Sequence, residues 1–440
     1  MFRIARPALL AVFILSSPVK ATEKPATTVI YLGATLIDTS TGTTSPNAAI
    51  FTRGDRIVAI RSGVGVVARN GQELVDIHGK FVIPGLVNSH VHTATVADPT
   101  VAKAYLRREL YSGVTAVRDM AGDVRLLSEL KREAEFGEFP SPDIFYVALT
   151  AGPGFFVDPR THAAARGRVA GQVPWMQAIT PETNLPIAMA EVVGTGATAI
   201  KIYGDLSGSL VKNLTAEAHR QHLLVWSHAA VFPALPSDIA DAGVDVMSHA
   251  CLLGYQLSDP PPLTSEDPAP VDAAKFLNPN PAMSALYQTM KQRGIILDAT
   301  LLPYEIELVH SCNGDLSAHL AREAYQAGVL LSVGTDDDPL WDDPNSAIDA
   351  ELTLLVDKVG MTTAEALRSA TVIGARAAGQ ENDAGSIEVG KLANLVVLDK
   401  NPLENIANIR SVYMVVKRGV RHRRSAYKPV TSKQMKQHAE

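Results

Sequence analysis

The sequence predicts an α/β fold: a (β/α)8 barrel of the TIM type, accompanied by a small β-sandwich domain built from both chain ends. Between residues 84 and 384, strand-like segments alternate with helical patterns eight times, as parallel βα units do. Residues 22–83 and 385–425 are instead typical of short strands separated by turns. A chain of 440 residues is long enough for one large domain with a smaller one attached.

The change of hydrophobic period along the chain predicts the barrel elements in order. We expect strands at 86–92, 115–119, 143–149, 198–203, 224–228, 244–249, 295–300 and 330–336. We expect helices around 101–111, 124–136, 182–194, 207–222, 235–242, 282–293, 317–328 and 345–371. The alternative, a doubly wound open sheet, favours a glycine-rich loop after the first strand, but Asn88-Ser89-His90-Val91-His92 stands there.

The first residues of the chain are typical of a secretory signal peptide. Arg3 and Arg6 precede a short apolar run, and a small residue ends the segment. The run is shorter than the roughly 20 residues that span a bilayer. We therefore expect a signal peptide at 1–21 and a mature protein that is periplasmic or secreted and not held in a membrane. We expect a solvated tail at 426–440.

The composition excludes several classes of function. The formal net charge is −6, so we expect no nucleic-acid partner, because phosphate binding needs a basic surface. Hydrophobic residues at 46% exclude a disordered chain. The two cysteines, Cys251 and Cys312, are too few for a cysteine-rich zinc module. In an oxidising compartment they are able to pair, and two buried thiols are the open alternative.

Metal-ligand residue types stand at the carboxyl ends of several predicted strands. His90 and His92 end the first strand, where residues two apart point the same way. Strands five, six and eight end in His228, His249 and Asp336. Active sites of (β/α)8 barrels lie at this end. Imidazole and carboxylate ligands suit zinc, with manganese, iron and nickel as alternatives. The pattern therefore predicts a metal centre.

Three further residues are candidates for this site. Lys201 and Tyr203 should face the barrel axis from the fourth strand. A lysine inside a barrel needs a partner or a chemical change, because a buried ammonium is costly. Tyr203 is a candidate hydrogen-bond donor to a substrate oxygen. His162 lies on the loop after the third strand, which should overhang the site, and is a candidate substrate contact.

These residues together resemble the metal-dependent amidohydrolase superfamily over essentially the whole mature chain. The resemblance is carried by Ile83-Pro84-Gly85-Leu86 before His-x-His, the strand-four lysine, the histidines that end strands five and six, Gly334-Thr335-Asp336, and the closing run from Gly385 to Leu398. The segment Ser112–Asp119 is similar to the imidazolonepropionase-like and Xaa-Pro-dipeptidase-like branch.

The resemblance implies a centre of two divalent ions, zinc above all, bridged by a carbamate that CO2 forms on Lys201. It implies these metal ligands: His90, His92, Lys201, His228, His249 and Asp336. A hydroxide bridging the ions would attack the substrate carbonyl, and Asp336 would serve as catalytic general acid and base. The chain would be a hydrolase of amide or peptide bonds.

The substrate is open at this stage. We expect a small amide, a dipeptide or an N-acyl amino acid with a free carboxylate, and a xenobiotic or mycotoxin amide of the same shape is an alternative. A one-metal deaminase, cyclic amidase or lactonase is a further alternative, although Val231 stands where related deaminases place a glutamate. A non-enzymatic binding protein is the least favoured interpretation. The oligomeric state is open, a homo-oligomer included.

Overall fold

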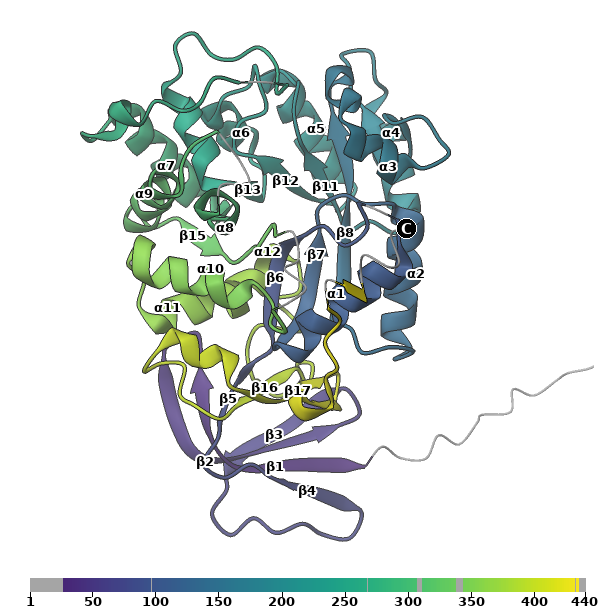
Figure 1. Cartoon of the computed structure of the whole chain (residues 1–440), viewed down its shortest axis with the longest axis vertical. Helices are drawn as coiled ribbons and strands as arrows, with labels where there is room; N and C mark the ends of the chain where they lie inside the picture. Colours follow the sequence, from purple (N-terminus) through teal and green to yellow (C-terminus); the bar gives the residue numbers. More distant parts are fainter. Residues whose placement is uncertain are drawn as a thin grey trace, which may run out of the picture.

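A computed structural model describes residues 27–95, 97–266, 268–306, 311–337, 343–431 and 433–434. The expected signal peptide, at 1–21, lies outside these residues. The chain forms a barrel and a separate sheet, and Figure 1 shows the sheet at one end of the barrel, where purple strands of the N-terminal segment lie beside yellow-green strands of the C-terminal segment.

The eight parallel barrel strands that the sequence predicts are present. They are β6 (Leu86–Val91), β7 (Val114–Asp119), β8 (Asp143–Ala151), β11 (Ala199–Ile202), β12 (Leu224–His228), β13 (Val246–Ser248), β14 (Ile296–Asp298) and β15 (Leu330–Ser332). Each pairs with the next in this order. The ring closes where Ser89 N donates to the Val333 carbonyl at 2.8 Å and Asp336 N donates to the His90 carbonyl at 3.0 Å. A short hairpin, β9 (Gln172–Val173) and β10 (Met176–Ala178), lies beside the end of β8, to which β10 pairs in parallel.

Helices surround the barrel, and two short ones, after β8 and after β14, carry residues that line its mouth. The helices are α1 (Pro99–Tyr111), α2 (Val124–Glu135), α3 (Pro159–Ala165), α4 (Leu185–Gly194), α5 (Gly208–Arg220), α6 (Pro236–Ala242), α7 (Pro281–Arg293), α8 (Leu302–Glu305), α9 (Gly314–Gln326), α10 (Ile348–Leu354), α11 (Thr363–Arg368) and α12 (Gly374–Ala377). Several begin with an Asp or Asn side chain that caps free backbone N–H groups, as Asp98 and Asn280 do.

The single helical stretch expected over 345–371 is wrong in one respect. It is interrupted after a π-helical turn at Leu355–Val359. Gly360 then adopts a φ of +87°, a conformation that glycine takes without strain. Thr362 caps the next helix, α11, in a capping box with Glu365. The breaker and the cap therefore divide the segment into two helices.

Both chain ends build the second sheet, as predicted. Its strands are β1 (Thr28–Asp38), β2 (Thr43–Arg53), β3 (Arg56–Ser62), β4 (Gln72–Asp76), β5 (Phe81–Pro84), β16 (Leu395–Leu398), β17 (Val412–Lys417) and β18 (Val420–Arg423). They form one continuous sheet in the order β18-β17-β16-β5-β1-β2-β3, with β4 paired to β1. The junction of the two chain ends is the antiparallel pair β5–β16. Since β5 leads directly into β6, this sheet fixes the start of the first barrel strand.

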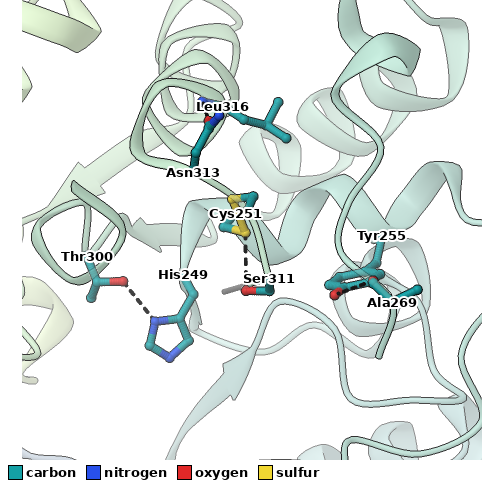
Figure 2. The surroundings of a disulfide bond; sticks show 9 residues. His249, Cys251, Tyr255, Ala269, Thr300, Ser311, Asn313 and Leu316 are labelled. Carbon is teal, nitrogen blue, oxygen red and sulfur yellow. Dashed lines mark hydrogen bonds between the residues drawn. A yellow bond between two sulfur atoms is a disulfide. The ribbon is translucent and has the colours of Figure 1, made fainter. Parts of the chain in front are cut away.

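Cys251 and Cys312 form a disulfide. Cys251 lies in the 3-10 helix η2 (Ala250–Leu257), two residues after His249, and Cys312 lies just before α9. Figure 2 shows the disulfide beside Ser311 and close to His249. The cross-link therefore ties the segment after β13 to the segment that follows β14.

Among the described residues, no helix is long and apolar enough to span a membrane.

Candidate metal centre and substrate cavities

Four histidines and an aspartate converge at the carboxyl ends of the barrel strands. The ring centroid of His90 lies 5.3 Å from that of His92 and 5.1 Å from that of His249, and the centroid of His228 lies 4.7 Å from that of His249. Asp336 Oδ1 is 3.2 Å from His92 Nε2 and 3.6 Å from His90 Nε2. Ligand atoms of His90, His249 and Asp336 lie within 4.8 Å of one another, which is a possible metal site.

The backbone at this end of the barrel is held in an unusual conformation. His249, Thr300 and Asp336 have φ values of +72°, +45° and +45°, in the left-handed region that non-glycine residues rarely adopt. They follow β13, β14 and β15, three neighbouring strands. Such conformations persist where the surrounding structure enforces them, and they cluster at active sites. Here they accompany the turn of two side chains, His249 and Asp336, toward the centre of the barrel mouth.

Asp298 lies against the candidate site and was not predicted from the sequence. Its carboxylate is fully buried, and Oδ2 lies 2.6 Å from His90 Nδ1. Ser89 Oγ donates to the other oxygen at 3.1 Å. A carboxylate accepts the Nδ1–H of the ring, so the lone pair of His90 Nε2 is left facing the site, as a metal ligand requires. The signal in the sequence is an acidic residue inside the apolar strand 295–300.

Lys201 is fully buried and faces the barrel interior, as predicted from the alternation of its strand. Its Nζ lies 2.5 Å from Ser248 Oγ, and among the described residues no carboxylate lies within ion-pair distance of it. Burial lowers the pKa of Lys201 to about 7, although the charges of Asp298 and Asp336 act in the opposite direction. A large share of the side chain is therefore the neutral amine near neutral pH.

The protonation states of the other candidate ligands fit a metal centre. Burial, followed by the charge of Lys201, lowers the pKa of His228 well below its usual value. Burial likewise holds the pKa of His249 low. Burial alone would raise the pKa of Asp336, but the neighbouring histidines, His90 first, hold it below its usual range. Neutral imidazoles and an ionised carboxylate are the forms that bind metal ions.

Buried hydrogen bonds fix the backbone on both sides of Asp336. Asn88 Oδ1 accepts from Thr335 N at 3.1 Å, and Asn88 Nδ2 donates to Thr335 Oγ1 and to Glu109. Asp337 accepts from Thr335 Oγ1 at 2.5 Å. Burial raises the pKa of Glu109 to about 7. These residues hold the segment after β15 against β6 and α1.

Of the two predicted substrate contacts, Tyr203 lies in the site, as the period of its strand predicts, whereas His162 lies outside it. The Tyr203 hydroxyl donates to the Met120 carbonyl, so its proton is engaged within the protein. The ring lines the site instead, with its centroid 4.6 Å from that of His228. His162 is exposed on α3 and does not line the site, whereas Arg160 does. Residues two apart on a helix point about 200° apart, so one of the pair faces away.

The site opens into two adjoining cavities. Cavity A, of about 710 Å³, has the four histidines and Asp336 on its floor. Its apolar walls include Phe155, Val157, Phe232, Leu252, Pro270 and Tyr304. Cavity B, of about 520 Å³, lies beside it, and its walls include Thr95, Val101, Tyr105, Leu149, Met176 and Pro303. Six residues line both: His92, Phe155, Asp158, Arg160, Tyr203 and Asp336.

The charge of the two cavities is mostly negative. Among the described residues that line them, Arg160 alone is a lysine or arginine. Its guanidinium donates to the Asp158 carboxylate at 2.7 Å and 3.1 Å, which orients it. Arg166, another cation of the same region, donates to the Ala97 carbonyl and lines neither cavity. A carboxylate that entered the site would therefore meet its cation at Arg160.

Comparison with known proteins identifies the family. Residues 81–421 match the family model "Amidohydrolase family". The chain belongs to the amidohydrolase family. Curated relatives of this amidohydrolase include an ochratoxinase from Aspergillus niger, 23% identical over 88% of this chain and 84% of that protein, and an imidazolonepropionase from Cutibacterium acnes, 28% identical over 80% and 84%.

Solved structures share the fold of this chain. The A. niger ochratoxinase superimposes with a TM-score of 0.72 at 21% identity, covering 93% of this chain and 98% of that one. A Xaa-Pro dipeptidase superimposes with a TM-score of 0.70 at 20% identity, covering 90% and 100%. The expected family and its barrel are thus confirmed. The protein is an amidohydrolase, a hydrolase of amide bonds from a metal-dependent family.

Proposed function

We propose that this amidohydrolase uses a centre of two divalent ions, zinc above all, to cleave the amide bond of a small substrate with a free carboxylate. The observation that carries the proposal is the convergence of four imidazoles, the Asp336 carboxylate and the buried Lys201 at one end of the barrel. The proposed ligands are the six residues named from the sequence: His90, His92, Lys201, His228, His249 and Asp336. Bound divalent ions would supply a Lewis acid and lower the pKa of water toward neutrality.

Lys201 is proposed to carry a carbamate. Its neutral amine would add to the carbon of CO2 and release one proton, so a neutral side chain becomes an anion able to bridge two cations. Two features support this chemistry: the pKa lowered to about 7, and a hydrogen-bond partner, Ser248, that carries no charge. A carbamate would offer oxygen ligands where the bare amine offers one nitrogen.

Asp336 is proposed to move the proton of the reaction. The neighbouring histidines lower the pKa of Asp336 and so keep it ionised, which is the form that can take up a proton. One proton of the attacking water would pass to Asp336 while the water oxygen bonds to the carbonyl carbon. Asp336 would then return the proton to the nitrogen as the carbon–nitrogen bond breaks, giving a carboxylic acid and an amine.

The substrate is proposed to be a dipeptide or an N-acyl amino acid with apolar groups. Arg160, at the junction of the two cavities, supports recognition of a free carboxylate, and the aromatic and aliphatic walls of cavity A support an apolar side chain or acyl group. The similarity to an ochratoxinase supports a second candidate of the same shape, a xenobiotic or mycotoxin amide. The similarity to an imidazolonepropionase keeps a cyclic amide as a third.

An oxidising compartment, periplasmic or extracellular, is proposed for the mature protein. The Cys251–Cys312 disulfide supports it, since disulfides persist mainly outside the cytosol. The expected leader at 1–21 supports the same compartment.

A small-molecule amide is the proposed partner.

Metal analysis joined to an activity assay tests this function. The purified protein should hold about two divalent ions per chain and release amine from N-acyl amino acids. His90→Ala should lose metal and activity together, and Lys201→Ala should regain part of its activity when short-chain carboxylic acids are added. Full activity after exhaustive chelation would contradict the metal centre. Unchanged activity of Lys201→Ala would contradict the carbamate.

A further inference from the structure

We propose that cavity B is a second substrate-binding site, so that the preferred substrates carry a bulky apolar group on each side of the scissile amide. Cavity A would receive one group and cavity B the other. This inference rests on the proposed function and narrows it: small dipeptides would be poor substrates. The observation that supports this inference is that the two cavities meet at the proposed reaction centre.

The junction of the cavities coincides with the proposed proton carrier. Asp336 and His92 line both cavities, so a bond held at Asp336 faces into both. A trans amide is planar and sends its two substituents in opposite directions. An acyl group and an amine group joined at Asp336 would therefore point into different cavities.

The sizes of the cavities argue against a small substrate. Binding sites for drug-sized ligands have volumes of about 300–1,000 Å³. Cavity A, at about 710 Å³, falls in this range by itself. Cavity B adds a space of about 520 Å³ that a compact dipeptide seated over Asp336 would leave without protein contacts. A second large group is needed to fill it.

The walls of cavity B favour an apolar group. Val101, Leu149 and Met176 are aliphatic. Several hydroxyl groups around them are engaged within the protein: Thr93 Oγ1 donates to Asp119, and the Tyr105 hydroxyl donates to Asp337 at 2.9 Å. Few donors are therefore free to bind a polar substituent, and burial of apolar surface is the main source of affinity there.

Four substrates that share one amide and one carboxylate test the inference on the metal-loaded enzyme: acetylglycine, acetylphenylalanine, benzoylglycine and benzoylphenylalanine. Each aromatic ring should raise kcat/KM on the order of 10- to 100-fold. The two gains should multiply, because groups in separate cavities act independently. Benzoylphenylalanine no faster than acetylglycine would overturn the inference.

Two matched variants assign the cavities. Val101, on α1, lines cavity B alone, and Leu252, on η2, lines cavity A alone; both are half-buried. Val101→Phe should remove the gain from one of the two rings and Leu252→Phe the gain from the other, with metal content unchanged in both. If both variants weaken the response to the same ring, one cavity serves both groups and the proposal is wrong.

Binding measurements separate failure of this inference from failure of the proposed function. If the metal-loaded protein hydrolyses none of the four compounds, the proposed amide substrate class fails. Calorimetric titration with the same compounds would then still address the cavities. Each aromatic ring should tighten binding separately, with Val101→Phe and Leu252→Phe each cancelling one gain. Equal affinity for all four compounds would overturn the two-cavity inference in that case as well.

Discussion

Removal of the Cys251–Cys312 disulfide should destabilise the barrel by a calculable amount. The two cysteines are 61 residues apart in sequence. A cross-link of that span lowers the entropy of the unfolded chain, and for a closed loop of this length the effect is about 4 kcal/mol at 25 °C. The three tryptophans, Trp175, Trp226 and Trp341, all belong to the barrel segment of the sequence, so intrinsic fluorescence reports its unfolding in urea.

The comparison should use two perturbations. A reductant breaks the cross-link and keeps both sulfur atoms, whereas Cys251→Ala with Cys312→Ala removes both, including the fully buried sulfur of Cys251. Reduction should lower the free energy of unfolding of the wild type by about 4 kcal/mol. The double variant should lose the same amount plus a smaller loss from poorer packing. Reductant should not change the free energy of unfolding of the double variant. Two titratable thiols in the native protein without reductant, or stability indifferent to reductant, would refute the reasoning.

Three further predictions concern the site. Asp298→Asn should weaken zinc binding 10- to 100-fold, because His90 loses the carboxylate that orients it. Competition with a fluorescent chelator measures the affinity. Asp315→Asn, at an exposed position, should leave the zinc affinity unchanged. The pKa of Lys201 is about 7 in the folded protein against an ordinary 10.5, so the unfolded chain binds more protons between these values. In metal-free, CO2-depleted protein the free energy of unfolding should therefore rise from pH 7 to 10. Urea unfolding checks this, and Lys201→Met should abolish the rise. Amidation of the substrate carboxylate should lower kcat/KM on the order of 10- to 100-fold, and Arg160→Met should remove that difference.

The elements that local sequence determines were predicted well. The eight barrel strands lie within a few residues of their predicted bounds, because burial on both faces makes them apolar runs between helical patterns. His90, His92, His228, His249 and Asp336 could be grouped from the sequence alone, since the parallel strands of a barrel end at one face. The inward direction of Lys201 followed from the two-residue period of its strand.

Contacts between distant segments were decided by the tertiary structure. Asp298 meets His90 across 208 positions of sequence, and no local pattern records such a partner. The Tyr203 hydroxyl was open to substrate by its residue type, but a nearby Met120 carbonyl accepts its proton. Each of these outcomes depends on distances of a few ångströms between separate elements. The hydrophobic pattern predicts that these elements belong to a barrel, but it does not predict which of their side chains meet.

The sequence by itself determined the type of fold, the ligand-bearing strand ends and the kind of chemistry that such residues support. Only the tertiary structure decided that Arg160 faces the site and His162 does not, that Cys251 and Cys312 pair, and that two cavities meet at Asp336. The physical reason is that ligand type and strand period are local properties. The direction of a loop residue and the shape of a cavity result instead from the packing of many segments at once.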